Sequence, residues 1–232
     1  MHLTNLLIME IIKVENVKKD YFLGKTVVNA LRGVDLVVKK DEFLAIAGPS
    51  GSGKTTLLNL ISGIEKPTSG RVFIDGIELP CLSHNELSDI RANKIGFIFQ
   101  NFNLLPVLTA LENVEYPLLL SDKIPARDKR ENAKKALELV GLSKFSKHKP
   151  MELSGGQRQR VAIARAIVTR PSVILADEPT ANLDHKTGEE ILELMRTINK
   201  EQKTVFVFST HDQKIIDMAN RVVKLWDGLI SD

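Results

Sequence analysis

The feature that most constrains this chain is a glycine-rich run, GPSGSGKT, at residues 48–55. It follows a short apolar stretch at residues 43–47 that is typical of a buried strand, and it leads into a helical pattern at residues 54–62. Glycines allow the backbone to curl until successive N–H groups point into one concavity, and the following helix adds the positive end of its dipole. Strand, N–H concavity and helix in this order predict a phosphate-binding site on an α/β fold.

A glycine-rich turn that binds nothing is the alternative interpretation. From average composition, the pattern G-x-x-x-x-G-K-[ST] should occur by chance in about 1% of chains of this length. Because the run also has the flanking strand and helix that a phosphate loop requires, we interpret it as functional. We expect Lys54 to reach the β- and γ-phosphates of a nucleotide, and the Thr55 hydroxyl to bind Mg²⁺. The other phosphate contacts expected from this run are Ser50, Gly51, Ser52, Gly53 and Thr56.

A second apolar run, VILADE at residues 173–178, ends in two acids. Two solvated loop carboxylates would look the same in isolation. Beside a phosphate loop, Asp177 at the tip of the strand is expected to hold Mg²⁺ through water. Glu178, one residue further on, is placed to accept a proton from the attacking water. These two runs together predict hydrolysis of a nucleoside triphosphate.

Short β-branched runs alternate with longer helical patterns along the chain, which is typical of an α/β protein with a mainly parallel sheet. Near the N-terminus, three runs separated only by turns predict separate strands that pair antiparallel, at residues 11–17, 27–31 and 34–38. Residues 103–170 contain helical patterns and no convincing strand. We therefore expect one domain, with an α/β core and β subdomain over residues 10–99 and 171–232 and an inserted helical subdomain over residues 100–170.

The composition is that of an ordinary folded chain, since 43% hydrophobic and 26% charged residues exclude disorder. A net charge of +3 is too small to indicate binding to nucleic acid, and no such partner is expected.

The single cysteine, Cys81, cannot form an internal disulfide, which fits a reducing compartment. No apolar run approaches the roughly 18 residues that span a bilayer. The apolar opening lacks the features of a signal peptide, and Met1 and Met9 are both candidates for the translation start.

The pentapeptide LSGGQ, at residues 153–157, separates this chain from other classes of phosphate-loop protein. Ser154 and the two glycines are expected to open a helix and expose its N–H groups as a second anion site. An ordinary serine cap with a glycine turn is the alternative. The pentapeptide lies between the phosphate loop and the acidic strand end, and this order favours the functional interpretation. The arginines that follow it, among them Arg158 and Arg165, are interpreted as the polar face of that helix.

With these motifs the sequence resembles the ATP-binding subunits of ABC transporters over about residues 10–230, LSGGQ being their signature motif. The resemblance implies a P-loop NTPase core that binds ATP and Mg²⁺. It also implies a head-to-tail dimer of two copies, in which the signature motif of one copy faces the phosphate loop of the other across two ATP molecules. Two anion sites on one chain agree with a ligand held across a symmetric interface. Ser154, Gly155, Gly156 and Gln157 would then contact the ATP of the other copy.

The resemblance implies further site residues, position by position. Tyr21 matches the aromatic residue that stacks on adenine, although a half-buried strand tyrosine would look the same. Gln100, after the strand expected at residues 95–99, matches the glutamine near Mg²⁺ and the attacking water. Asp184 matches the aspartate that crosses the dimer interface, and His211 matches the histidine that contacts the γ-phosphate. The expected catalytic residues are thus Glu178, His211, Gln100 and Lys54, and the expected metal-binding residues are Thr55, Gln100 and Asp177.

The segment FIFQNFNLLPVLTALENVEYPLLL, at residues 97–120, is similar to the LolD/MacB group of lipoprotein-release and macrolide-export ATPases. The cell-division ATPase FtsE is a close alternative. Membership of this group implies an integral membrane permease as partner, and a location on the cytoplasmic face of the membrane through that partner. Residues 100–120 are expected to form the cleft that receives a helix of the permease, with a plain core segment as the alternative.

Two other classes of function stay open from the sequence. One is an ABC-type ATPase of a soluble assembly, in iron–sulfur cluster assembly or DNA maintenance. No heptad-rich coiled coil separates the phosphate loop from the acidic strand, which argues against the DNA-repair type. The other is a nucleotide-binding regulator without turnover, which the presence of both Glu178 and His211 disfavours.

Overall fold

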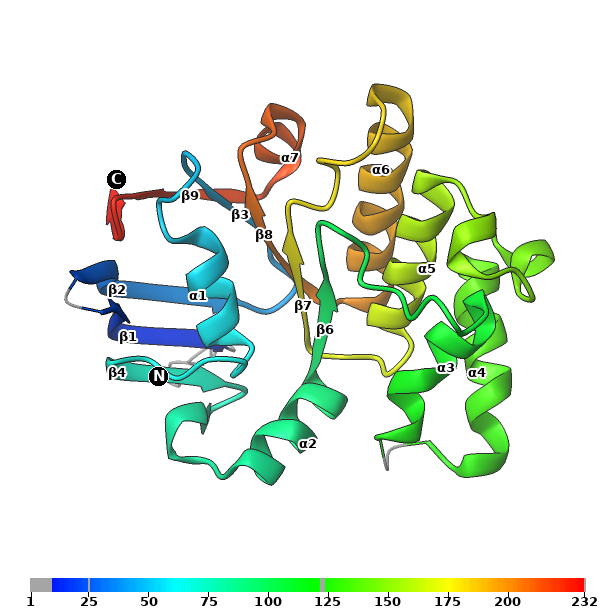
Figure 1. Ribbon diagram of the computed structural model, residues 1–232, viewed down its shortest axis with the longest axis horizontal. Coiled ribbons are helices and arrows are strands. Elements are labelled where there is room, and N and C mark those ends of the chain that lie inside the picture. Colours follow the sequence, from blue (N-terminus) through cyan, green and yellow to red (C-terminus); the bar gives the residue numbers. More distant parts are fainter. Residues whose placement is uncertain (1–9, 25, 122–123, 232) are drawn as a thin grey trace, which may run out of the picture.

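The computed structural model describes residues 10–24, 26–121 and 124–231, and its central element is a six-stranded sheet (Figure 1). Both candidate start residues, Met1 and Met9, lie outside the described residues. The strand order is β10-β9-β3-β8-β7-β6, and neighbours are parallel except for the antiparallel pair of β9 and β10. The strands are β3 (Phe43–Ala47), β6 (Ile95–Ile98), β7 (Val173–Asp177), β8 (Val205–Thr210), β9 (Arg221–Trp226) and β10 (Leu229–Ser231).

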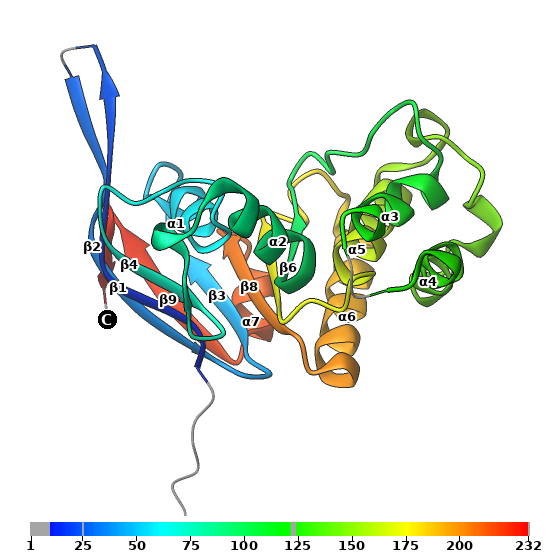
Figure 2. The same ribbon diagram turned by 90° about the horizontal axis from the view of Figure 1, so that it is seen from below.

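A second, antiparallel sheet has the order β2-β1-β4-β5. Its strands are β1 (Glu10–Leu23), β2 (Thr26–Lys39), β4 (Ser69–Ile74) and β5 (Ile77–Glu78). The prediction of separate strands at residues 27–31 and 34–38 is wrong, because both runs belong to the single strand β2. Val17 pairs with Val34 and Lys18 with Arg32, so Gly33, with a φ of +122°, is the extra residue of a bulge rather than part of a turn. One end of this β1–β2 ribbon projects beyond the rest of the molecule in Figure 2.

Helix α1 (Lys54–Ile61) lies between the two sheets and begins directly after the glycine-rich loop. Its buried residues Leu57 and Leu58 share one hydrophobic cluster with Val14 of the antiparallel sheet and Leu44 of the central sheet. Burial on both sides fixes the helix firmly, because each large aliphatic side chain removed from water contributes about 1.5–3 kcal/mol. The first turn of α1 is therefore held at the C-terminal end of β3.

A group of helices packs together beside the opposite face of the central sheet and gathers on the right in Figure 1. They are α3 (Ala110–Leu119), α4 (Ala126–Leu139), α5 (Gly155–Ile167) and α6 (His185–Gln202). Three of them, α3 to α5, are inserted between β6 and β7 in the sequence. The predicted fold class, a mainly parallel α/β core with an antiparallel β subdomain and an inserted helical subdomain, is confirmed. Among the described residues, no helix combines the length and the apolar character needed to cross a membrane.

Two further α-helices are α2 (His84–Lys94), before β6, and α7 (Gln213–Met218), after β8. The sequence of α2 has no apolar periodicity that would predict a helix, and Leu87 is the one buried residue of this helix. Its start is nevertheless marked in the sequence by Ser83 and Glu86, which form a capping box: each backbone N–H donates to the side-chain oxygen of the other residue.

Candidate active site

The glycine-rich loop, the acidic strand end and the predicted histidine meet at a cleft of about 660 Å³. The cleft lies where β3, β6, β7 and β8 end, which is where open parallel sheets bind their ligands. The predicted site residues that line it are Ser50, Gly51, Gly53, Lys54, Thr55, Thr56, Gln100, Glu178 and His211. Strand β2 forms a further wall that the motifs do not predict, through Val27, Val28, Asn29, Ala30 and Arg32.

The path of the loop depends on Gly53, the residue that caps α1. Its φ is +102°, and an added Cβ would lie only 2.6 Å from the carbonyl oxygen of Ala30. A side chain is excluded here both by the backbone conformation and by the approach of β2. The chain can therefore pass directly from the loop into α1, whose first turn carries N–H groups without partners inside the helix and lines the cleft.

Lys54 lies at the base of the loop, where it is only 6% exposed. Its ammonium group donates to the carbonyl oxygens of Gly48 and Pro49, at 2.8 and 2.9 Å. These bonds hold a positive charge at a fixed place beneath the loop. The buried hydroxyl of Ser52 has no hydrogen-bond partner among the described residues. A fixed cation and an unpaired hydroxyl in the same loop suit a phosphate group.

Thr55 and Asp177, two of the three predicted metal-binding residues, contact each other. The Thr55 hydroxyl lies 3.1 Å from each carboxylate oxygen of Asp177 and donates to them. Gln100, the third, lines the same cleft. Within the described ranges, no group of three or more His, Cys, Asp or Glu residues could hold a metal. Oxygen donors with one carboxylate fit Mg²⁺, which takes its other ligands from substrate phosphates and water.

Glu178 and His211 come from the loops after the neighbouring strands β7 and β8, and they touch. The distance from Nδ1 of His211 to Oε1 of Glu178 is 2.7 Å. The Glu178 side chain is 17% exposed and that of His211 is 70% exposed, so the carboxylate lies deeper than the imidazole. The two loops are joined a second time by the Thr180 hydroxyl, which donates to Oδ2 of Asp212 at 2.9 Å. The structure therefore positions the predicted base and the predicted histidine as a unit.

The backbone of Glu178 has an unusual conformation, with a φ of +46°. Few residues other than glycine adopt this left-handed region, and those that do are held there by their surroundings. The N–H of Glu178 donates to the carbonyl oxygen of Ser209 at 2.9 Å, and its own carbonyl accepts from the N–H of Ala181 at 3.2 Å. Strained residues of this kind are concentrated at functional sites.

The segment that follows β6 and carries Gln100 is tied to two other segments. The Asn182 side chain donates to the carbonyl oxygen of Gln100 at 2.9 Å. Arg165 of α5 donates to the carbonyl oxygens of Phe102 and Asn103, at 2.8 and 2.5 Å. Burial lowers the pKa of Arg165 to about 10, so the side chain stays charged at neutral pH. Arg165, interpreted from the sequence as part of the polar face of this helix, thus binds the segment that carries Gln100 through its guanidinium group.

The signature residues lie at the N-terminal end of α5 and do not line the cleft of their own chain. Ser154 caps the helix: its hydroxyl accepts from the N–H of Gln157, and its N–H donates to Oε1 of Gln157 at 2.9 Å. Gly156 packs closely against α6, since an added Cβ would lie 2.4 Å from Cγ2 of Thr187. Asp184, which caps α6, is likewise outside the cleft.

Gly156→Ala is expected to lower the free energy of unfolding, because the new Cβ overlaps Thr187. Overpacking of this kind costs about 1–3 kcal/mol, whereas alanine gains at most about 1 kcal/mol over glycine in a helix. Adding Thr187→Ser removes the overlapping methyl group and should restore the loss. Urea denaturation of both single variants and the double variant measures the coupling. A double variant no more stable than Gly156→Ala would contradict the described packing.

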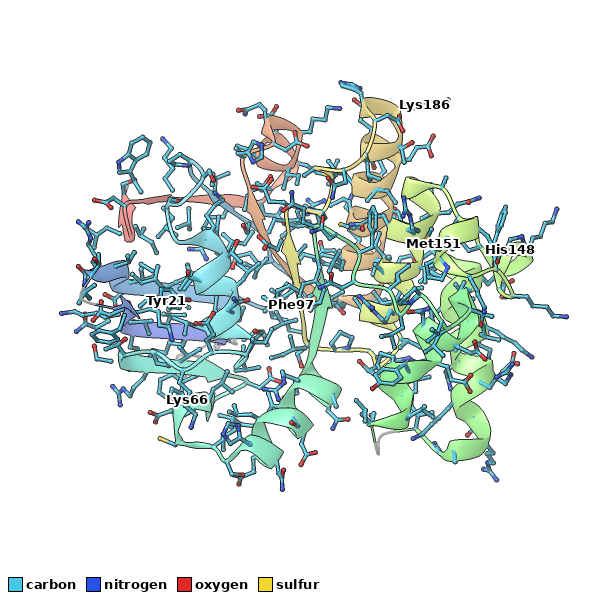
Figure 3. All side chains as sticks on the ribbon, viewed as in Figure 1. Tyr21, Lys66, Phe97, His148, Met151 and Lys186 are labelled. Atoms are coloured by element: carbon cyan, nitrogen blue, oxygen red, sulfur yellow. The ribbon has the colours of Figure 1, made fainter. Side chains whose placement is uncertain are left out.

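Tyr21 lies on β1 (Figure 3). It is not among the residues that line the cleft. Its hydroxyl donates to Oε2 of Glu65 at 2.7 Å. Burial, and then the bond to Glu65, raise the pKa of Tyr21. Val28, which pairs with Tyr21 across the ladder, does line the cleft. The contact of Tyr21 with adenine stays a prediction.

Comparison with known proteins places these motifs in a family. Residues 31–181 match the family model described as ABC transporter. The chain is 48% identical over 220 residues to the uncharacterized ABC transporter ATP-binding protein MJ0796 of Methanocaldococcus jannaschii, and the match covers 94% of each chain. A dimeric structure of MJ0796 in a post-hydrolysis state, bound to ADP and Pi, has a TM-score of 0.88 to this chain at 46% identity, over 95% of this chain and 97% of that one.

Two further relatives belong to named transport systems. The lipoprotein-releasing system ATP-binding protein LolD of Legionella pneumophila is 46% identical over 210 residues, which cover 90% of this chain and 92% of LolD. The macrolide export ATP-binding/permease protein MacB of Rhodopirellula baltica is 46% identical over 222 residues, which cover 95% of this chain and 32% of MacB. The resemblance stated from the motifs is confirmed: the chain belongs to the ABC transporter family and is one of its ATP-binding cassettes, an ATPase.

Proposed function

We propose that this cassette is the motor subunit of a LolD/MacB-type transporter, and that it hydrolyses ATP as a head-to-tail dimer bound to a separate membrane permease. The convergence of Lys54, Thr55 and the Glu178–His211 pair on one cleft, with Asp177 in contact with Thr55, supports the proposal most. In this assignment residues 10–99 and 171–232 hold the nucleotide. Residues 100–170 carry the signature motif.

The charges around the cleft suit hydrolysis of the γ-phosphate. Lys54, together with the N–H groups and hydroxyls of residues 50–56, holds the β- and γ-phosphates. Glu178 accepts a proton from water while the water oxygen bonds to the γ-phosphorus, and the bond to the β–γ bridging oxygen breaks to release ADP and phosphate. His211 donates to a γ-phosphate oxygen, and Gln100 orients the water.

Thr55, Gln100 and Asp177 are the residues that would hold Mg²⁺, since the Thr55 hydroxyl and the Asp177 carboxylate already lie 3.1 Å apart beside the phosphate loop. When bound, Mg²⁺ neutralises charge on the phosphate oxygens.

A second copy of the chain would complete the site. The signature residues cap a helix N-terminus, which is a good anion site, but they do not line the cleft of their own chain. A relative was solved as a dimer with ADP and Pi. We infer that Ser154, Gly155, Gly156 and Gln157 close over the ATP of the other copy, that Asp184 crosses the interface, and that Tyr21 stacks on adenine.

An apolar cleft of about 270 Å³, formed by β6, α2, α3 and α5, suits the permease contact. Its walls include Ile64 and the rings of Phe97 and Phe99, which stack with their centroids 4.2 Å apart. Of the segment at residues 100–120, Pro117 is the residue that lines this cleft. We infer that a helix of the permease docks here, so that the transporter holds this subunit at the cytoplasmic face of the membrane.

Ile64→Glu is expected to abolish binding to the permease while ATP turnover by the isolated subunit stays within about twofold of wild type. Ile64 is 49% exposed, so the charge is tolerated in the free protein but would be buried without a partner in the complex. Leu139→Glu is the matched control, because Leu139 is 39% exposed on α4 and does not line the cleft. The measurement is co-purification of each tagged variant with integral membrane proteins from detergent-solubilised membranes.

Loss of the membrane partner from Ile64→Glu and its retention by Leu139→Glu would support the docking site. Equal binding by both variants would contradict it. Wild-type protein that hydrolyses ATP but retains no membrane partner would favour an ATPase of a soluble assembly.

A further inference from the structure

Gln159 is a fully buried polar residue in the signature helix α5. Its Nε2 donates to the carbonyl oxygen of Pro179 at 2.7 Å, whereas its Oε1 is buried without a hydrogen-bond partner among the described residues. The orientation of the amide follows from this contact, because the reverse orientation would set two acceptor oxygens against each other.

Packing alone does not account for a glutamine at this position. Its neighbours in the helix, Val161 and Ala162, are buried and apolar. A buried acceptor without a partner is destabilising, and an apolar side chain of similar length would avoid that penalty. The hydrogen bond that Gln159 donates to Pro179 therefore accounts for a glutamine at this position.

The bond to Pro179 fixes the peptide that joins Pro179 to Thr180, one residue beyond Glu178. Proline has no N–H, so its carbonyl is its one backbone group that can be held by a hydrogen bond. Glu178 is itself in the left-handed conformation, with its N–H bonded to Ser209 of β8. The peptide before Glu178 is thus anchored to the central sheet, and the peptide after Pro179 is anchored to the signature helix.

We propose that Gln159 is a positioning residue that fixes the backbone of Glu178 and links the signature helix to the catalytic carboxylate of the same chain. The inference rests on the proposed function, in which the signature helix contacts the ATP of the other copy. Closure of the dimer around one ATP would then act, through Gln159 and Pro179, on the hydrolysis of the second ATP.

The test is Gln159→Met, which keeps the length of the side chain and removes the donor. Displacement of a catalytic group by about 1 Å lowers turnover by up to about 100-fold, so we expect kcat to fall about 10- to 100-fold with KM for ATP unchanged. Gln159→His, which retains an N–H donor, should recover part of the loss. The matched control is Asn199→Leu, because the 4% exposed Asn199 also donates from a buried amide to a carbonyl oxygen, that of Thr204, but far from the cleft in α6.

A purely structural role would make Gln159→Met resemble Asn199→Leu, with lowered stability and normal kcat in the folded protein, and would overturn the proposal. Single-turnover hydrolysis in a Glu178→Gln background further separates the positioning role of Gln159 from a purely structural role. If Gln159 acts through Glu178, adding Gln159→Met to Glu178→Gln should cause no further loss; a further 10-fold loss would overturn the positioning role. Normal turnover by Glu178→Gln alone would instead overturn the part of the proposed function that assigns Glu178 as the base.

Discussion

Glu178→Gln is expected to lower steady-state phosphate release about 10³-fold while ATP binding stays intact. Glutamine keeps the size of the side chain and can still contact Nδ1 of His211, which lies 2.7 Å from Oε1 of Glu178. An amide cannot take the proton of the attacking water at neutral pH. Because the reaction stops before hydrolysis, the ATP-bound dimer should accumulate, and light scattering after size-exclusion chromatography with ATP would detect it.

Glu193→Gln is the control for this experiment, because Glu193 is exposed on α6 and does not line the cleft. It should hydrolyse ATP like the wild-type protein. Wild-type phosphate release from Glu178→Gln would exclude Glu178 as the base. A variant that binds ATP and remains a monomer would count against the head-to-tail dimer instead.

Lys54→Ala is expected to weaken ATP binding roughly 10- to 100-fold, because a hydrogen bond to a charged group contributes about 1.5–3 kcal/mol. A further loss should appear in kcat, since in the proposed function the same ammonium group stabilises the charge that develops on the γ-phosphoryl group during transfer. Titration calorimetry with Mg-ATP measures the first effect, and phosphate release at saturating ATP measures the second.

Lys66→Ala provides a matched control. Its ammonium group also donates to two backbone carbonyl oxygens, those of Pro80 and Leu82, both at 3.4 Å. Lys66 lies beyond the C-terminal end of α1, away from the phosphate loop (Figure 3). ATP affinity and turnover should be unchanged in this variant. Unchanged ATP affinity in Lys54→Ala would remove Lys54 from the binding site.

Much of the site could be predicted because its chemistry is local in the sequence. The phosphate loop is one continuous run, and Glu178 and His211 each follow a short apolar strand directly. Parallel strands place such positions at one edge of a sheet, so Glu178 and His211 meet although 33 residues separate them. The mainly parallel arrangement of the central sheet could be predicted from the alternation of short apolar runs with helical patterns along the chain.

The features that could not be predicted depend on partners distant in the sequence. The pair Arg32-Gly33 has the composition of a turn, and only pairing with β1 shows that the strand continues through it. Helix α2 is polar almost throughout and lacks apolar periodicity. The roles of Arg165 and Gln159 depend on hydrogen bonds to backbone carbonyl groups. Every residue has such a carbonyl, so the residue types do not show which one is bound.

The alternation of side chains along the central strands has a consequence for how the chain folds. Phe206 and Phe208 of β8 belong to one hydrophobic cluster, with Phe43 of β3 at a centroid distance of 4.5 Å from Phe208, whereas Val205 and Val207 belong to the other. A slip of one residue would place phenylalanines in the space built for valines. Parallel strands from distant segments associate late and slowly. The difference in size between the phenylalanine and valine side chains would therefore disfavour out-of-register pairing of β8 during this slow association.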